Sequence, residues 1–142
     1  DYDSKPNRTQ KHWHVFCGHN VEECNLNGFD FIEPIWNGIK NIDSTLELER
    51  AYLNAHAYGI EPHIHRDDGD VTLIYYPRLD WKIDWGGGTA IYNNNVTEIE
   101  KYFVNKGNRL ILFDAHLPHQ AQPVSRLCFQ LRTCIVFKTN RV

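Results

Sequence analysis

The sequence predicts a helix-flanked β-sandwich or jelly roll, and two observations support this fold class. A segment with helical spacing lies in the N-terminal third, and from about residue 49 onwards the chain consists of short strand-like runs separated by turn residues. Helices followed by many short strands are typical of a mainly β domain with supporting helices. At 142 residues and 42% hydrophobic, the chain fits one domain over 1–142. We divide it into N-terminal helical support over 1–48 and a jelly-roll core over 49–138.

The N-terminal elements follow from local spacing. Residues 1–12 are polar and are expected to be mobile. The segment 34–42 places isoleucines at helical spacing and predicts a short amphipathic helix. "STLE" at 44–47 is a capping-box pattern that would begin a second helix. The strict alternation of apolar and polar residues that follows favours a strand over about 49–58 instead.

The rest of the chain alternates between strands and turns. β-Branched and aromatic runs bounded by glycine, proline or asparagine predict strands. These strand segments are 71–76, the glycine turn and strand of 85–92, 109–115, and one or two strands in 127–138. The segment 97–103 fits either a capped helical turn or a strand.

Composition excludes several classes of protein. The net charge of −3 is scattered, without the basic stripe that a nucleic-acid partner requires. No apolar run reaches the roughly 20 residues of a membrane span. The four cysteines are too few and too unevenly spaced for a disulfide framework, which predicts a reduced, intracellular, cytoplasmic protein. The chain begins at Asp1 and contains no methionine, so we expect the natural N-terminus, with any targeting segment, to be missing.

The stretch "HIHRDDGD" at 63–70 is dense in groups that bind metals. Residues two apart on a strand point to the same side about 7 Å apart, so His65 and Asp67 can face one point in space. His119, in "FDAHLPHQAQPV", is the best third ligand, with His116 as its competitor. Two histidines and one carboxylate leave coordination positions open and suit non-heme Fe(II) that activates O₂. A zinc site at Cys17, His19 and Cys24 is a weaker alternative, because no second half-site has matching spacing.

Arg132 opens the apolar strand "RTCIVFK". A guanidinium directed into a sandwich interior is costly unless it meets an anion, and its planar fork suits a carboxylate. Arg126 is the alternative, although "VSR" resembles an exposed turn.

With these residues in order, roughly residues 49–138 resemble the Fe(II)/2-oxoglutarate-dependent dioxygenases, most closely the prolyl 4-hydroxylase-like branch with its small bacterial and phage members. The resemblance rests on "HIHRDD", "VTLIYYP", "WGGGTAIY", "NRLILFD", "LPHQAQPVSR" and "LRTCIVFK". It implies a double-stranded β-helix, also called a jelly roll or cupin-like fold. It implies hydroxylation of an unactivated C–H bond, a prolyl residue in a peptide being the first candidate, with Fe(II), 2-oxoglutarate, O₂ and optionally ascorbate as cofactors.

The resemblance also assigns roles to residues. His65, Asp67 and His119 would hold the iron, and Arg132 would bind the distal carboxylate of 2-oxoglutarate. Tyr76 matches a position that binds the same carboxylate, and Tyr58 matches a tyrosine that lines the cosubstrate pocket. Gly88 stands where relatives carry an acidic residue in a "GG-E-T" turn. Arg132 also lies farther from the histidine than in many relatives, which keeps Arg126 as the alternative.

Two other functions fit the same residues. A metal-binding cupin would use His63, His65 and His119, with Asp68 or Asp70 as the acid. A non-catalytic jelly-roll module would bind a peptide or sugar on an aromatic platform consisting of Trp81, Trp85 and Tyr92. The substrate of an oxygenase, whether peptide or small molecule, does not follow from fold and cofactor.

Overall fold

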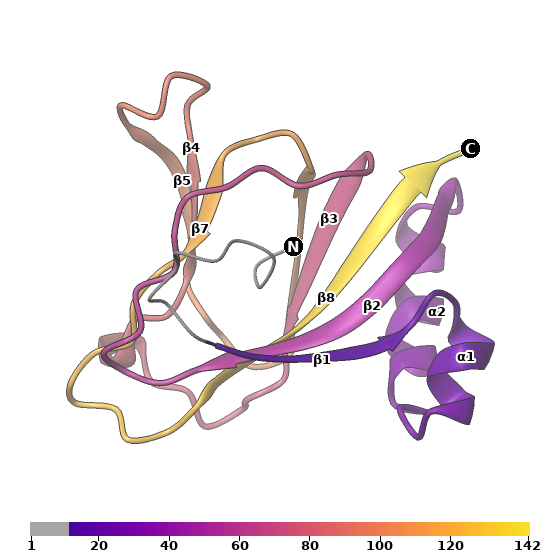
Figure 1. Cartoon of the computed structure of the whole chain (residues 1–142), viewed down its shortest axis with the longest axis horizontal. Helices are drawn as coiled ribbons and strands as arrows, with labels where there is room; N and C mark the ends of the chain where they lie inside the picture. Colours follow the sequence, from indigo (N-terminus) through magenta and orange to yellow (C-terminus); the bar gives the residue numbers. More distant parts are fainter. Residues whose placement is uncertain (1–11) are drawn as a thin grey trace, which may run out of the picture.

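The computed structural model describes residues 12–142 as two antiparallel β-sheets with two helices packed on the larger sheet (Figure 1). The elements in chain order are β1 (Trp13–Gly18), α1 (Val21–Leu26), α2 (Ile32–Ile42), β2 (Leu46–His56), β3 (Val71–Tyr76), a 3-10 turn (Ile83–Trp85), β4 (Thr89–Tyr92), β5 (Ile99–Phe103), β6 (Arg109–Asp114), β7 (His119–Ala121) and β8 (Arg132–Arg141). The larger sheet has the strand order β1-β2-β8-β3-β6, and the smaller sheet has the order β5-β4-β7. The predicted mainly β fold with flanking helices is confirmed. Of residues 1–12, which were expected to be mobile, residues 1–11 lie outside the described part of the chain.

Most of the predicted elements are present. The helix predicted for 34–42 is α2, which begins two residues earlier, at Ile32. The strand predicted for 49–58 is β2, and it begins at Leu46. The capping-box alternative is therefore wrong, because the fully buried Leu46 already pairs with Arg141 in the sheet. The ambiguous segment 97–103 forms the strand β5.

The region expected to provide only helical support also contributes a strand. β1 pairs with β2 at the edge of the larger sheet, with His14 opposite Asn54. Its alternate residues face opposite sides, since His14 and Phe16 line a cavity, whereas Trp13 and Val15 lie on the other face of the sheet. Neither β1 nor α1 was predicted from the sequence.

The helices cover one face of the larger sheet. α2 buries Trp36 and Ile39 against the sheet, where the ring of Trp36 stacks on Phe137 with centroids 6.0 Å apart. Leu73 and Ile135 belong to the same apolar cluster. Full burial of each such side chain contributes about 1.5–3 kcal/mol, so this face contributes substantially to the stability of the fold.

The opposite face of the larger sheet looks towards the smaller sheet. Alternate residues of the central strand β8 point to this side, so Arg132, Cys134, Val136 and Lys138 line the space between the sheets. All four cysteines are buried as free thiols. Across the described chain, no helix is long and apolar enough to cross a membrane.

Candidate active site

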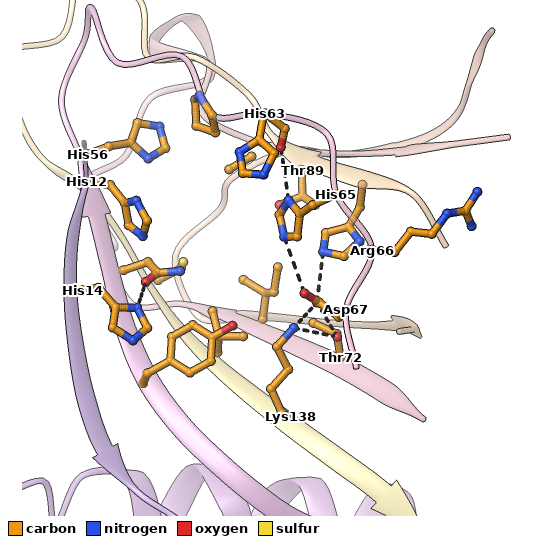
Figure 2. Close-up of a pocket in the computed structure, with 18 of the residues that line it drawn as sticks. His12, His14, His56, His63, His65, Arg66, Asp67, Thr72, Thr89 and Lys138 are labelled. Atoms are coloured by element: carbon orange, nitrogen blue, oxygen red, sulfur yellow. Dashed lines mark hydrogen bonds and ion pairs between the residues drawn. The ribbon is translucent and has the colours of Figure 1, made fainter. Parts of the chain in front are cut away.

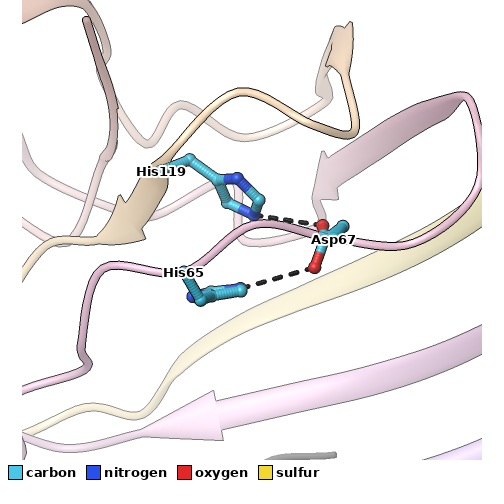
Figure 3. Close-up of side chains that lie close together, drawn as sticks. All are labelled: His65, Asp67 and His119. Atoms are coloured by element: carbon cyan, nitrogen blue, oxygen red, sulfur yellow. Dashed lines mark ion pairs between the residues drawn. The ribbon is translucent and has the colours of Figure 1, made fainter. Parts of the chain in front are cut away.

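His65, Asp67 and His119 converge between the two sheets (Figure 3). Nε2 of His119 lies 3.0 Å from Oδ2 of Asp67, and Nε2 of His65 lies 3.5 Å from Oδ1 of the same carboxylate. One potential ligand atom from each residue lies within 4.8 Å of the other two. Within residues 12–142 this is the single group of three or more histidine, cysteine or acidic side chains with that geometry, so the zinc alternative at Cys17, His19 and Cys24 is not formed there.

Backbone hydrogen bonds bring the three residues together. His65 and His119 form an isolated antiparallel bridge, with N–H to O distances of 3.0 and 2.9 Å in the two directions. The N–H of Asp67 donates to the carbonyl of Ala115 at 2.8 Å. The H-x-D pair thus lies in a connection before β3 and not on a regular strand, and His119 opens the separate strand β7. The pairing with a neighbouring strand end replaces the continuous strand that the sequence suggested.

Each histidine is held in one tautomer by a backbone carbonyl. Nδ1 of His119 donates to the carbonyl of Leu117 at 2.8 Å, and Nδ1 of His65 donates to that of His63 at 3.1 Å. Because a carbonyl can only accept, Nδ1 carries the proton in each neutral ring, and Nε2 presents a lone pair. Imidazoles that bind metals are oriented in the same way.

The lone pairs give a direct test of whether a cation fits. With Nδ1 committed as a donor, Nε2 of His119 and Oδ2 of Asp67 are two acceptors that face each other at 3.0 Å. Such an arrangement is stabilised by a proton or by a nearby metal cation. Two imidazole nitrogens and one carboxylate match the ligand preferences of Fe(II), so the residues fit the metal.

The electrostatics of the site keep Asp67 charged and the imidazole of His65 neutral. Burial alone would raise the pKa of Asp67, but His119 and Lys138 outweigh burial and hold this pKa below its usual range. Burial, reinforced by the neighbouring His119, lowers the pKa of His65 to about 4. At neutral pH, both groups therefore present the protonation state that a metal ligand requires.

A cavity of about 1020 Å³ opens from these residues between the sheets. Figure 2 shows His12 and His14 on one wall of the cavity and His65 and Asp67 across from them, while Lys138 reaches towards Asp67 from β8. Arg132 and Thr89 belong to the same lining. The cavity is large enough to hold a dicarboxylate together with part of a second molecule, because small-ligand pockets typically measure about 300–1,000 Å³.

Arg132 is the second buried feature of the cavity. Its side chain is 1% exposed, and Nε donates to the carbonyl of Gly87 at 2.5 Å. Its other contacts are weak, at 3.5 Å to the sulfur of Cys134 and to Oγ1 of Thr89. No carboxylate from residues 12–142 forms an ion pair with it. A guanidinium that is buried without a counterion is a strong candidate for binding an anion.

The glycine turn allows this placement of Arg132. Gly87 has a φ of +70°, and a Cβ there would lie 3.1 Å from Cδ of Arg132. The departure from "GG-E-T" also has a steric reason. A Cβ on Gly88 would lie 2.4 Å from the carbonyl oxygen of Phe103 and 2.5 Å from the hydroxyl of Tyr102, so these two residues leave no room for a side chain at this position.

The two predicted tyrosines have different surroundings. Tyr76 is fully buried, and its hydroxyl lies 2.5 Å from Oγ1 of Thr89, with its ring 5.6 Å from the guanidinium carbon of Arg132. Tyr58 is 48% exposed and contacts the ring of Phe129, and the structure does not bring it to the cavity. β2 ends at His56 and the chain turns at Gly59, so the strand alternation does not extend to Tyr58.

The rival residues lie outside the converging group of His65, Asp67 and His119. Arg126 and His116 are exposed. Asp68 pairs with Arg50, and Asp70 accepts from the N–H of Arg141. His63 lines the cavity but does not belong to the converging group.

The aromatic platform imagined for a binding module packs a loop instead. Trp81 is largely buried, and its Nε1 donates to the carbonyl of Gly86 at 2.9 Å. Its ring meets Trp85 edge to face, and both residues belong to a small apolar cluster. The hydroxyl of Tyr92 donates to Gln120 at 2.6 Å.

Several residues of the cavity were not predicted from the sequence. Lys138 and Thr72 contact Asp67, and Thr89 links Tyr76 to Arg132. His56 lies opposite Arg132 in the sheet, and burial, followed by the charge of Arg132, lowers its pKa to about 3. The alternation of β8 from Arg132 onwards could have assigned Lys138 to the inner face.

The fold and site together define a class, the jelly-roll metalloenzymes that carry two histidines and one carboxylate as ligands. A family model described as the 2OG-Fe(II) oxygenase superfamily matches residues 48–137. The chain belongs to this superfamily and is a 2-oxoglutarate-dependent dioxygenase of it. No curated protein matches the sequence significantly.

Solved structures agree on the fold. One similar structure is a prolyl hydroxylase from Trichoplax adhaerens in complex with a peptide fragment of the hypoxia inducible factor oxygen degradation domain. The TM-score is 0.65 and the sequence identity is 18%, and the match covers 96% of the present chain and 66% of the hydroxylase. A Pseudomonas putida prolyl-4-hydroxylase matches with a TM-score of 0.62 and 14% sequence identity. This match covers 94% of the present chain and 70% of the hydroxylase. A viral collagen prolyl hydroxylase from Paramecium Bursaria Chlorella virus-1, in its 2OG complex, matches with a TM-score of 0.60 and 14% sequence identity. This match covers 99% of the present chain and 84% of the viral enzyme. The chain spans about two thirds of the length of the first of these.

Proposed function

We propose that this protein hydroxylates an unactivated C–H bond, with His65, Asp67 and His119 as the iron ligands and Arg132 as the partner of 2-oxoglutarate. The observation that carries this proposal is that the three ligand-type side chains share one cavity with a buried arginine for which residues 12–142 supply no counterion. When bound, iron supplies the activation of O₂ that couples decarboxylation of 2-oxoglutarate to succinate with oxidation of a C–H bond.

The side chains bind and orient the reactants. The fork of Arg132 binds the distal carboxylate of the cosubstrate and discriminates against monocarboxylates that lack it. Tyr76 holds Thr89 through their hydroxyl contact, so that Oγ1 of Thr89 stays beside the guanidinium. Gly87 accepts from Nε of Arg132, which leaves the two terminal nitrogens for the ligand. Arg126 is exposed and does not serve this role.

The substrate proposed first is a prolyl residue in a peptide. The similarity of fold to several prolyl hydroxylases supports this choice, and one of these is in complex with a peptide fragment. The cavity extends from the proposed metal site to His14 and Phe16 on β1, which leaves room for part of a peptide beside the ligands. The free, buried thiols fit a reducing compartment, and we assign the enzyme to the cytoplasm.

The test is succinate production from 2-oxoglutarate under air with Fe(II), measured against the variant His119→Ala. Addition of proline-containing peptides should increase succinate formation and give a hydroxylated peptide, detected by mass spectrometry. Succinate at the level of the variant, with and without peptide, contradicts the enzyme proposal. Succinate that rises only with small molecules would retain the oxygenase and reject the prolyl substrate.

The two alternatives have less support. The cupin arrangement requires His63 in the metal site, but His63 lies outside the converging group. The non-catalytic module requires exposed aromatic residues, but Trp81 is largely buried. Membership of the oxygenase superfamily also favours the enzyme over both.

A further inference from the structure

Lys138 contacts a proposed metal ligand although the metal chemistry does not require it. Its side chain is 2% exposed, and Nζ contacts Oδ2 of Asp67 and lies 3.3 Å from Oγ1 of Thr72 (Figure 2). An ammonium group is among the most costly groups to bury. The carboxylate of Asp67 is its one ion-pair partner within residues 12–142. A lysine in this position therefore acts on Asp67.

Lys138 and Thr72 act on the same oxygen of Asp67. The hydroxyl of Thr72 donates to Oδ2 at 2.8 Å, and Nζ of Lys138 donates to that oxygen as well. Nε2 of His119 also lies 3.0 Å from Oδ2, so three groups surround an oxygen that has only two lone-pair directions. Oδ1, which faces Nε2 of His65 at 3.5 Å, receives neither bond. The two oxygens are thus made unequal before any metal binds.

We propose that Lys138 is a positioning residue that restricts Asp67 to ligation through one oxygen and weakens metal binding by its like charge. The inference rests on the proposed metal site. A carboxylate that binds through both oxygens occupies an extra coordination position, which the cosubstrate and O₂ need. By engaging Oδ2, Lys138 keeps that position open.

Two opposing effects decide the direction of the change when Lys138 is replaced. Loss of its bond to Asp67 frees the carboxylate to move, which disfavours binding. Loss of a unit charge beside a divalent cation favours binding, and at a few ångströms this electrostatic effect is the larger one. Metal affinity therefore increases without Lys138, while turnover decreases because both oxygens of Asp67 can bind.

The test measures Mn(II) binding by electron paramagnetic resonance on the full chain, alongside the absorption spectrum of the Co(II)-loaded protein. Lys138→Met should bind Mn(II) at least tenfold more tightly than the wild type, with a changed Co(II) spectrum and lower turnover. Lys106→Met, which removes an exposed lysine, should match the wild type in all three. Lys138→Arg keeps the charge and should stay within about threefold of wild-type affinity.

Each outcome decides the proposal. Mn(II) affinity of Lys138→Met that is unchanged within twofold, or weaker, overturns it. If that variant does not fold, Thr72→Val removes the other bond to Oδ2 and should change the Co(II) spectrum in the same direction; an unchanged spectrum overturns the proposal. If Asp67→Ala still binds Mn(II) as the wild type does, the proposed metal site itself is rejected. This result separates failure of the proposed function from failure of this inference.

Discussion

The two faces of strand β8 have opposite characters. On the helix side, Ile135 and Phe137 pack into an apolar cluster with α2. On the cavity side, the same strand presents Arg132 at its beginning and Lys138 six residues later, both almost completely buried. The first face stabilises the fold by removing apolar surface from water, whereas the second face buries two cations at a cost. One central strand therefore links the stable part of the molecule to its chemistry, and substitutions on its two sides should have separable effects.

The largest effect is expected on the cavity side, at the carboxylate beside Lys138. Asp67→Ala should reduce 2-oxoglutarate turnover to the background of metal-free protein, because two imidazoles hold an open-site metal poorly. Succinate formation measures the loss, and Asp80→Ala, which removes an exposed carboxylate paired with Arg78, is the control. Substantial activity in Asp67→Ala would remove this residue from the ligand set.

The next largest effect is expected on the helix side of β8 and concerns the free energy of unfolding. Phe137→Ala should lower the free energy of unfolding by about 3–5 kcal/mol, through lost burial and the cavity left beside Trp36. Urea denaturation of the metal-free protein measures this change. Leu127→Ala, at a 67% exposed position, should stay within about 0.5 kcal/mol of the wild type. If the folded fraction of Phe137→Ala loses Mn(II) binding as well, the two faces are not separable.

At the other end of the cavity side, Arg132 should behave differently from Arg126, which is exposed and does not line the cavity. Arg132→Ala should raise the 2-oxoglutarate concentration for half-maximal turnover roughly 10- to 100-fold, since a hydrogen bond to a charged group contributes about 1.5–3 kcal/mol. Arg126→Ala should change it by less than about twofold, because an exposed charge contributes little. The reverse pattern would assign the cosubstrate to Arg126.

The smallest expected effect is a dependence of the protein's stability on pH. His56 is buried with a pKa lowered to about 3, and His65 has one of about 4, so both are neutral in the folded protein. The unfolded chain takes up these protons below about pH 6.5, so their contribution to stability is complete above that pH and is lost as the pH falls towards about 4. The thermal midpoint of the metal-free protein should therefore fall across this window.

A matched variant isolates the histidine contribution. His56→Gln removes one buried imidazole and should make the decrease in thermal midpoint shallower. An equally steep decrease in the variant would assign the pH effect to other groups. The charge of Asp67 contributes in a lower window, because its pKa is held below the usual range of a carboxyl.

The sequence predicted those parts of the site that depend on residue type and order along the chain. His65, Asp67 and His119 were chosen because they occur in order around strand signals, and the structure brings the three together. Lys138 and Thr72 escaped prediction because their contact arises from the register between β3 and β8. Tyr58 was assigned to the cavity by analogy, but it follows the end of β2, where strand alternation no longer fixes its direction.

The same distinction holds for the fold. Strands with strong β-branched or apolar patterns, such as Val71–Tyr76, were predicted within a residue or two. β1 was missed because Trp13–Gly18 carries apolar residues on both faces and lacks a clear alternation, and both faces remain partly open. Its place in the sheet depends on pairing with β2, which is a tertiary effect.

The most direct test of the central claim is an anaerobic titration of the protein with Fe(II) and then with 2-oxoglutarate, followed by calorimetry. We expect one Fe(II) per chain, binding of one 2-oxoglutarate that requires the metal, and loss of the second step alone in Arg132→Ala. Binding of 2-oxoglutarate with equal affinity in the absence of any metal, or no stoichiometric uptake of Fe(II), would contradict the account.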